Sequence, residues 1–486
     1  MGSDQTLHHH HVLLVSFPSQ GHVNPLLRLA KHLASKGLLA TFSSTHHIIH
    51  KIHKSTGHVQ PIDIGGGRLR FESFTDGWED HDDPRRSDLN VYIPQFQTVG
   101  HDSFVQLVKK HSESGTPVSC IISNPFIPWV SDVAAELGIP CALLWVQSCF
   151  VYSVYYHYFH NLASFPTVDQ PNKSVELPGL PTLESDEIPS FLHPVYSPDK
   201  RVLKDVILGQ FKNLEKTFCV LVDSFEELER ESLKPLLSSA PIIRPIGPLY
   251  KWKEEKDVRG DMWSAAEECI EWLDSKPVGS VVYVSFGSVA VLEQQSMEEI
   301  TRGLLNCGQP FLWVVRPPPK ESSKGGGRLP DWLVQQADGK GLVVQWCPQE
   351  RVLAHPSVAC FITHCGWNSS MEILSSGVPI VAAPQWGDQV TNAKFLTDVY
   401  GVGVRLLRSE NDLNTFSSER VANCIVEVTK GPKAEEFKKN ALKWKKAADD
   451  AAREGGTSYN NLDKFVMEVQ ALKQGLCTSE EDPHQS

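Results

Sequence analysis

Short apolar runs alternate with helical patterns through the first half of the chain. The run HVLLVSF leads through the loop PSQGHVNP into a segment where Leu26, Leu29, Ala30 and Leu33 recur at intervals of three and four, and Gly37 suits the residue after a helix end. Later runs, LLATFSS, PVSCIISN, IPCALLWV and FCVLVDSF, predict further strands, the last closing the series. Strands that alternate with helices predict a doubly wound parallel sheet, which binds ligands at the carboxyl ends of its strands.

A second series of the same kind begins at GSVVYVSFGS and continues through PFLWVVR, GLVVQWC, VACFITHCG, VPIVAAP and GVGVRLL. Between the two series, the segment RPIGPLYKWKEEKDVRGD from Arg244 has the Pro/Gly-bearing, charged composition of an interdomain linker. The predicted order is an α/β domain over residues 1–250, a linker over 251–260 and a second α/β domain over 261–460. Residues 461–486 are expected to form a helix that packs back on the N-terminal domain, followed by a tail.

Three stretches do not follow this alternation. The proline-rich segment 166–198 has no sustained period and is expected to be a long surface loop near the site, and PPPKESSKGGGRLP is expected to be a mobile loop. The uncharged run Ile139–Phe159 reaches membrane-spanning length, but its proline, glutamine, serines and tyrosines favour a buried strand followed by a helix.

Composition narrows the class of protein. With 486 residues, 41% hydrophobic and 21% charged, the chain is an ordinary globular protein of two or three domains. Its net charge of −12 is unfavourable for binding the negatively charged phosphate backbone of a nucleic acid, which argues against nucleic acid as a partner. Eleven cysteines, an odd number, without a secretory signal favour a reducing compartment, and we expect a cytoplasmic protein with no stable membrane insertion.

The stretch from Trp346 to Gln389 carries the clearest chemistry. Within it, FITHCGWNSSMEIL runs from a buried strand through a glycine into a helix whose first backbone N–H groups are free to bind an anion. A diphosphate there would meet the positive end of the helix, with His364 beside it and Asn368 and Ser369 in the first turn. A simple strand–helix turn capped by Asn368 or Ser369 is the alternative.

The order and spacing of residues across this stretch resemble the signature box of plant family 1 UDP-sugar glycosyltransferases. The shared features are an initial Trp with Cys-Pro-Gln, the run His-Cys-Gly-Trp-Asn-Ser, a Glu three residues after that serine, and a closing Asp-Gln. The resemblance also covers GHVNP, FCVLVDSFEELE and EWLDSKPVGSVVYVSFGSV, and so most of the chain. It implies the GT-B fold, two Rossmann-like doubly wound domains that face a cleft, with the acceptor bound mainly by the first and the sugar donor by the second.

The resemblance also implies roles for individual donor-site residues. Trp346 would stack on uracil, which suits an aromatic face, with Gln349 beside the nucleoside and Glu372 on the ribose hydroxyls. His364, Ser369 and Ser288 would bind the diphosphate. The residues expected around the phosphate turn and the hexose are Trp367, Asn368, Asp388 and Gln389. No cofactor and no metal are expected, and UDP-glucose is the expected donor.

In the family, the histidine at the position of His22 is the general base that removes a proton from the acceptor hydroxyl, a role that suits imidazole. The family's usual partner for it is an aspartate, at the position occupied here by Asn124 in IISNPFIPW. An asparagine oxygen can hold the tautomer but supplies no charge to an imidazolium, so the base is expected to be weaker. A phenol needs a strong base, whereas a carboxylic acid arrives ionised, so Asn124 favours a carboxylate acceptor.

Together these residues predict an inverting, metal-free UDP-glucose glucosyltransferase, acting as a monomer on a phenolic acid to form a 1-O-β-glucose ester. NPFIPWVSDVA, LLWVQSC and YYHY resemble the branch that acts on hydroxycinnamic and hydroxybenzoic acids, including gallic acid. The alternatives are transfer to a phenolic or terpenoid hydroxyl, and a non-catalytic protein that binds a sugar nucleotide. Asp132 is interpreted as structural rather than as a replacement for the missing aspartate.

One further histidine pattern suggests a metal. His46, His50 and His53 are spaced to share one helix face, so they could ligate zinc, but no Cys or carboxylate cluster accompanies them, and exposed histidines of a loop region are the preferred interpretation. The sequence has no GxxxxGK(S/T) phosphate-binding loop. The segment GVGV at Gly401 lacks the third glycine of a dinucleotide-binding fingerprint.

Overall fold

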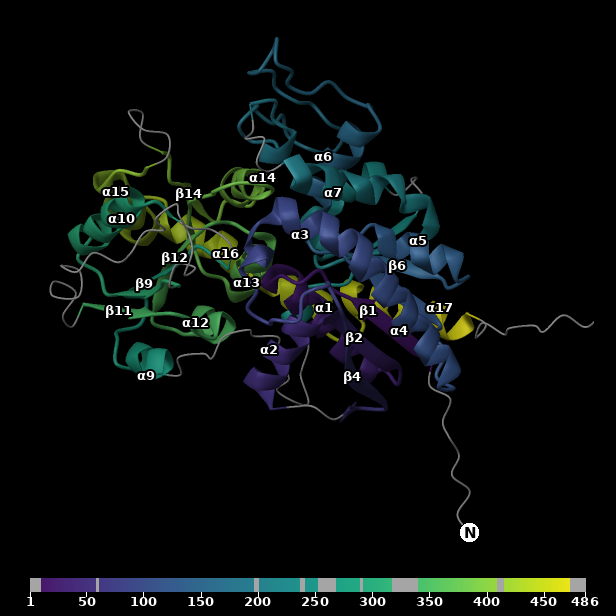
Figure 1. Ribbon diagram of the computed structural model, residues 1–486. Helices are drawn as coiled ribbons and strands as arrows, with labels where there is room; N and C mark the ends of the chain where they lie inside the picture. The colour runs from purple at the N-terminus through teal and green to yellow at the C-terminus, as the bar shows by residue number, and fades with distance from the viewer. Residues whose placement is uncertain are drawn as a thin grey trace, which may run out of the picture.

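The computed structural model describes residues 10–57, 61–195, 201–236, 241–251, 268–288, 292–316, 340–408 and 415–472. Two α/β lobes lie side by side, the N-terminal lobe in purple to teal and the C-terminal lobe mainly in green (Figure 1). Most of the expected linker, the segment PPPKESSKGGGRLP and the expected tail lie outside the described residues. No helix in the described ranges is long and apolar enough to cross a membrane.

The sheet of the N-terminal lobe has the order β3-β4-β2-β1-β5-β6-β7-β8, and every neighbouring pair is parallel except β3 with β4. Because β1 lies at the centre and the order reverses there, the carboxyl ends of β1 and β5 form the switch point where such sheets bind ligands. The strands are β1 (His11–Val15), β2 (Leu39–Thr45), β3 (Ile62–Ile64), β4 (Gly67–Phe74), β5 (Cys120–Ser123), β6 (Cys141–Trp145), β7 (Thr217–Val222) and β8 (Ile242–Pro245).

The helices of this lobe follow the strands as the alternating pattern predicts. They are α1 (Gln20–Ser35), α2 (His46–Thr56), α3 (Leu89–Gln95), α4 (His101–Glu113), α5 (Trp129–Glu136), α6 (Cys149–Phe159), α7 (Arg201–Lys212) and α8 (Glu226–Leu233). The run Ile139–Phe159 forms β6 and α6, so the prediction of a strand followed by a helix is confirmed. In α1 the predicted apolar positions are all buried, and they pack against the central strands.

The C-terminal lobe contains a sheet of parallel strands in the order β11-β10-β9-β12-β13-β14. Its strands are β9 (Val281–Ser285), β10 (Phe311–Val314), β11 (Gly341–Val344), β12 (Val358–Thr363), β13 (Ile380–Ala382) and β14 (Gly403–Arg405). Its helices are α9 (Glu268–Asp274), α10 (Gln294–Asn306), α12 (Gln349–Ala354), α13 (Trp367–Ser376), α14 (Gln389–Lys394) and α15 (Ser418–Lys430). The central strands β9 and β12 end at Ser285 and Thr363, which places the turns that follow them at one edge.

The last two helices join the lobes. Helix α16 (Ala434–Ala452) packs on α13 of the C-terminal lobe and on α8 of the N-terminal lobe. Helix α17 (Thr457–Ala471) packs on β8, and Figure 1 shows it in yellow against the N-terminal lobe. The predicted boundary at residue 460 therefore falls inside α17, because the chain leaves the C-terminal lobe at the turn before Thr457.

Two other sequence predictions need correction. The segment from Arg244 does not begin as a linker, because Arg244 and Pro245 lie in the edge strand β8, paired in parallel with β7. The strand was missed because it is only four residues long and contains an arginine, whose guanidinium leaves the sheet to pair with Glu468 of α17. The pattern FCVLVDSF is thus not the last strand of its series.

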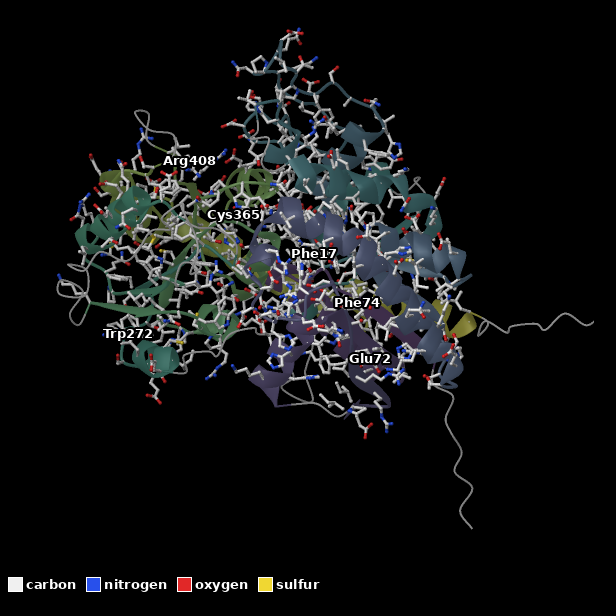
Figure 2. The ribbon with its side chains drawn as sticks, in the orientation of Figure 1. Phe17, Glu72, Phe74, Trp272, Cys365 and Arg408 are labelled. Atoms are coloured by element: carbon white, nitrogen blue, oxygen red, sulfur yellow. The ribbon has the colours of Figure 1, made fainter. Side chains whose placement is uncertain are left out.

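Side chains fill both lobes and the junction between them (Figure 2). The segment 166–198 is irregular where it is described, as predicted, but it is not only a surface loop: Val175 and Leu183 are fully buried and pair through their backbones. Near its end, Ser190 exchanges hydrogen bonds with Gly387 of the C-terminal lobe, and Phe191 packs on Trp386. This segment therefore closes one side of the junction.

Candidate active site

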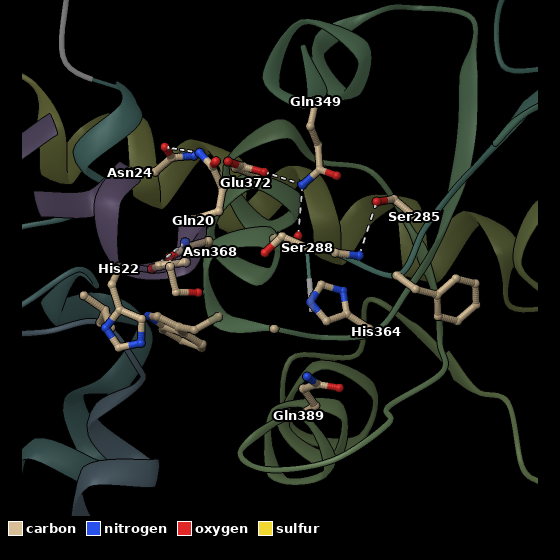
Figure 3. Close-up of a pocket in the computed structure, with 18 of the residues that line it drawn as sticks. Gln20, His22, Asn24, Ser285, Ser288, Gln349, His364, Asn368, Glu372 and Gln389 are labelled. Atoms are coloured by element: carbon tan, nitrogen blue, oxygen red, sulfur yellow. Dashed lines mark hydrogen bonds between the residues drawn. The ribbon is translucent and has the colours of Figure 1, made fainter. Parts of the chain in front are cut away.

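A cavity of about 1030 Å³ lies between the lobes, and side chains of both line it. It collects His22 and every residue that the sequence predicts for the donor site: Ser288, Trp346, Gln349, His364, Trp367, Asn368, Ser369, Glu372, Asp388 and Gln389. Asn124 does not line the cavity but lies directly behind His22. Figure 3 shows His22 facing the cavity from the N-terminal lobe, opposite the donor-site residues.

His22 is the third residue of α1, where the helix starts just after strand β1. Its Nδ1 donates a hydrogen bond to Oδ1 of Asn124, which follows β5, over 2.5 Å. This bond leaves Nε2 as the unprotonated atom that can act on a ligand in the cavity. Asn124 is fully buried, and its Nδ2 group has no hydrogen-bond partner in the described structure.

Aromatic rings surround the imidazole of His22. Phe17 and Phe126 approach it edge-on, with ring centroids at 5.3 and 5.0 Å. Phe126 holds a backbone φ of 75°, an uncommon conformation for a bulky residue that is typical of functional turns. Burial among these rings lowers the pKa of His22 to about 4, although the bond to Asn124 opposes the shift. His22 is therefore neutral at pH 7.

The donor side is built on the turn between β12 and α13. Gly366 precedes the helix in an extended conformation, no acidic residue lies in the first turn, and Cys365 before it has a φ of 62°. Both Gly287, with φ +74°, and Gly366 contact the ring of His364 so closely that a Cβ at either would collide with it, at 2.5 Å for Gly287. Glycine at these two positions thus makes room for the imidazole beside the helix N-terminus.

This turn is also connected to the turn that carries His22. Asn368 Nδ2 donates to the carbonyl of Gly21 over 3.0 Å, a contact between the first turns of α13 and α1. Burial lowers the pKa of His364 to about 4, and the positive charge of Arg316 adds to the shift. His364 is therefore a neutral hydrogen-bonding group at pH 7, and Ser288 lines the same part of the cavity (Figure 3).

Hydrogen bonds fix the orientation of the side chains of Glu372 and Gln349. Gln349 Nε2 donates to Glu372 Oε2 over 2.6 Å (Figure 3) and to Ser369 Oγ over 2.9 Å. The hydroxyl of Tyr283 donates to Gln349 Oε1 over 2.8 Å. Trp346 lines the cavity close to Gln349 in the sequence and is half-buried. The predicted nucleoside-binding residues thus lie together.

The predicted hexose-binding residues Gln389 and Asp388 already have hydrogen-bond partners within the protein. Gln389 Oε1 accepts from the backbone N–H groups of Gln385 and Trp386, so its Nε2 is the atom left for a sugar hydroxyl. Burial raises the pKa of Asp388 to about 6, and hydrogen bonds from Asn392 and Gln147 limit the rise.

Trp367 has a larger structural role than predicted. Its indole N–H, the only donor of the ring, bonds to the carbonyl of Asp223 in the N-terminal lobe over 2.8 Å. The ring also packs on Phe150 with centroids 5.6 Å apart. Trp367 borders the cavity, so a hexose can meet its ring or backbone but not its N–H group.

One group of cavity residues was missed from the sequence. Gln20, Asn24 and Arg28 lie at i, i+4 and i+8 of α1 and line the cavity as a polar stripe. A signal was present in the sequence, because Arg28 stands between the apolar residues Leu27 and Leu29 of the predicted helix. Arg28 contacts Glu372 and Glu350 of the other lobe.

The remaining sequence hypotheses concern metal and Asp132. The described residues hold no group of three or more His, Cys, Asp or Glu side chains able to bind a metal ion. His46, His50 and His53 belong to α2 rather than to a loop, and His50 stacks on His81 at 4.2 Å. Asp132 pairs with Lys216 and accepts from Asn213, so its interpretation as a structural residue is confirmed.

Comparison with known proteins agrees with this geometry. The family model described as UDP-glucoronosyl and UDP-glucosyl transferase matches residues 263–454. Gallate 1-beta-glucosyltransferase 84A24 of Punica granatum is 52% identical over 99% of this chain and 92% of its own length. Limonoid UDP-glucosyltransferase of Citrus unshiu is 50% identical over 99% of this chain and 93% of its own.

A solved structure extends the likeness to the whole fold. Os79 of O. sativa in complex with UDP superposes with a TM-score of 0.81 at 30% identity, covering 94% of this chain and 100% of that chain. The two parallel-sheet lobes, the cavity between them and nearly full-length similarity to named glucosyltransferases lead to one assignment. The chain belongs to the UDP-glucoronosyl and UDP-glucosyl transferase family and is a UDP-sugar-dependent glycosyltransferase of the GT-B fold.

Proposed function

We propose that this enzyme transfers glucose from UDP-glucose to the carboxylate of a phenolic acid, a hydroxybenzoate such as gallate or a hydroxycinnamate. The product is a 1-O-β-D-glucose ester. The observation that carries the proposal is the pair His22 and Asn124, a buried neutral imidazole supported by an amide instead of a carboxylate.

The strength of the base decides between acceptor classes. With a pKa of about 4, His22 is a poor match for a phenol of pKa about 10, since full proton transfer would be uphill by about 8 kcal/mol. A carboxylic acid with a pKa near 4 is ionised at pH 7 and needs no base. The same site therefore favours a carboxylate nucleophile.

The relatives support this choice of acceptor. The Punica granatum relative is named for gallate, a hydroxybenzoate, and is 52% identical to this chain over the aligned residues. The Citrus unshiu relative, named for limonoids, is almost as similar, so overall identity alone does not select the acceptor. The argument from His22 and Asn124 is independent of both names.

The reaction is proposed as a single displacement at the anomeric carbon. A carboxylate oxygen attacks C1 of glucose, the C1–O bond to the diphosphate breaks, and its electron pair leaves with UDP, so the configuration inverts from α to β. The positive N-terminus of α13 and hydrogen bonds from His364, Ser288 and Ser369 stabilise the leaving diphosphate. The bond between Asn368 and Gly21 sets the His22 turn against this donor turn.

The donor is held as the family resemblance implies. Trp346 stacks on uracil with Gln349 beside it, and Glu372 accepts hydrogen bonds from the ribose. Asp388 and Gln389 bind the hexose hydroxyls, next to the ring of Trp367. No metal is needed in this scheme, because helix dipole and side-chain donors supply the stabilisation of the diphosphate.

The setting is proposed to be the cytoplasm, with the enzyme acting as a monomer. All ten described cysteines are free and eight of them are buried, which suits a reducing compartment. Both sides of the cavity come from a single chain, so no second copy is needed to complete the site.

The test is a panel of hydroxybenzoic and hydroxycinnamic acids and size-matched phenols, each incubated with UDP-glucose while UDP release is followed. We expect turnover with the acids and products that mild alkali cleaves, because esters hydrolyse whereas phenyl glucosides survive. Alkali-stable products would move the acceptor to a hydroxyl. Absence of UDP release with every acceptor, despite UDP binding, would favour the non-catalytic alternative.

A further inference from the structure

A buried arginine connects the two lobes beside the expected ribose site. Arg28 of α1 has a side chain only 11% exposed, and it forms ion pairs with Glu350 of α12 and Glu372 of α13. Its Nη2 lies 3.2 Å from Glu372 Oε1. The ring of Tyr250 lies beside the guanidinium, at 5.6 Å, and Tyr250 donates to the backbone carbonyl of Glu372.

The contacts of Glu372 leave room for two more hydrogen bonds. An ionised carboxylate has about four acceptor positions. Arg28 takes one on Oε1 and Gln349 takes one on Oε2, so each oxygen keeps one position. A nucleoside diphosphate presents two neighbouring ribose hydroxyls, which matches the two positions that remain.

We propose that Arg28 is a positioning residue of the donor site, which favours the charged form of Glu372 and orients its carboxylate so that both oxygens accept ribose hydroxyls. Because Arg28 belongs to the acceptor lobe and Glu372 to the donor lobe, the ribose site is complete only when the lobes are in contact. This inference rests on the UDP-sugar donor and not on the proposed acceptor.

Electrostatics explains why the ion pair is needed. Burial raises the pKa of Glu372 to about 7, Arg28 opposes this rise, and the charge of Glu350 adds to it. Other titratable groups are coupled to this cluster: Asp223 after β7, the phenols of Tyr250 and Tyr283, the thiol of Cys347, and His32, which lies on the same helix as Arg28. Lys31 and Arg351 line the same cavity. Loss of Arg28 would raise the pKa of Glu372 further, so the carboxyl would be protonated more often at neutral pH and would lose acceptor positions.

The test measures binding of UDP and of 2′-deoxy-UDP by calorimetry from pH 6 to 8.5, with no acceptor present. For Arg28→Met we expect at least a tenfold rise in the Kd of UDP at pH 7. The ratio of the two Kd values should fall toward one, because the ribose contacts are lost, and UDP affinity should partly recover as pH rises and Glu372 ionises. Arg28→Lys should keep part of the discrimination, since it retains the charge.

Lys36→Met is the matched control. Lys36 is on the same helix and pairs with Asp463 of α17, so its loss removes a cation and an ion pair outside the cavity. UDP binding should be unchanged in this variant. Arg28→Met/Glu350→Gln removes the neighbouring negative charge and should regain UDP affinity over Arg28→Met, which keeps the test valid if the single variant folds poorly.

An equal loss of affinity for UDP and 2′-deoxy-UDP at every pH would overturn the proposal, since it would place Arg28 on the diphosphate or in the fold alone. Normal UDP binding by Arg28→Met would overturn it as well. Both results are independent of acceptor activity. A failure of the proposed ester chemistry would therefore be seen separately.

Discussion

Asn124 is the residue with the most consequence for the chemistry. It is fully buried behind His22, so a carboxylate in its place would sit in a low-dielectric environment 2.5 Å from the imidazole. Such a charge favours the imidazolium and raises the pKa of His22 from about 4. A stronger base helps an acceptor that must lose a proton, and the added charge repels an acceptor that is already ionised.

We therefore predict that Asn124→Asp raises the ratio of phenol to acid turnover. The measurement is kcat/KM for one hydroxybenzoic acid and one phenol of similar size in both proteins. UDP affinity should change little, because Trp346 and Glu372 belong to the other lobe. In the His22→Ala/Asn124→Asp double variant the gain should vanish. An unchanged or lowered ratio would make Asn124 a structural substitution only.

Gln389 is predicted to select the donor sugar. Its Oε1 is held by two backbone N–H groups, so Nε2 meets the hexose from a fixed direction. UDP-glucose should be preferred over UDP-galactose by about ten- to a hundredfold in kcat/KM, roughly 1–3 kcal/mol, because the two sugars differ in the direction of one hydroxyl. Gln389→Glu keeps the backbone contact and removes the donor, so it should reduce this preference. Equal kcat/KM for both donors in the unaltered enzyme would contradict the prediction.

Helix α17 is the element whose placement matters most for the fold. It belongs to the end of the chain but packs into the core of the N-terminal lobe, where Phe465 is fully buried and stacks on Phe218 with centroids 6.0 Å apart. Ion pairs of Arg244 with Glu468 and of Lys36 with Asp463 flank this contact. The N-terminal lobe therefore depends on residues that follow the C-terminal lobe.

Phe465→Ala should lower the free energy of unfolding by about 3–5 kcal/mol, because it removes a buried ring and leaves a cavity. Urea unfolding checks this, with Met467→Ala as the control on the same helix. Met467 is 59% exposed, so its loss should change stability by no more than about 0.5 kcal/mol. Equal unfolding midpoints for the two variants would show that α17 is not part of the core.

At the scale of the whole molecule, buried titratable groups set the pH dependence of stability. Burial lowers the pKa of several histidines to about 3 or 4: His11, His22, His32, His111 and His364. Below pH 6.5 the unfolded chain binds protons at these positions and the folded chain does not. Each such proton removes about 1.4 kcal/mol of stability per pH unit as pH falls from 6.5 to about 4.

Four buried acids among the described residues act in the opposite direction: Asp223, Glu229, Glu372 and Asp388. Burial raises the pKa of Glu229 and Glu372 to about 7 and that of Asp388 to about 6, so their contribution is lost as pH rises from about 4 to 7. The histidines outnumber these acids, so we predict a stability maximum near neutrality and a falling melting temperature from pH 6.5 to 5. Thermal unfolding in buffers of equal ionic strength measures it.

His32→Gln tests the cause of this dependence. His32 is buried outside the cavity, and its Nε2 donates a hydrogen bond to the carbonyl of Leu249 over 2.7 Å, a contact that a glutamine amide can replace. The variant lacks one titrating group, so its melting temperature should fall less steeply with acid than that of the unaltered protein. A steeper fall would assign the effect to other groups.

The sequence by itself determined the fold class, the donor turn and the departure at Asn124, because each is written in a short stretch of chain. Periodic apolar positions indicate strands and helices, and the strand–glycine–helix pattern around His364 predicts the turn between β12 and α13, where free backbone N–H groups suit an anion. Strand β8 was not predicted, because it is only four residues long and contains an arginine, which is too short a pattern of apolar positions to indicate a strand.

Only the tertiary structure decided which groups meet across the cavity. Arg28 and Glu372 are 344 positions apart, and Trp367 finds its acceptor 144 positions away in the other lobe. The pKa of His22 likewise depends on rings from two separate loops that exclude water from it. Burial and pairing of charge depend on distances in space, and no local pattern of residue types encodes those distances.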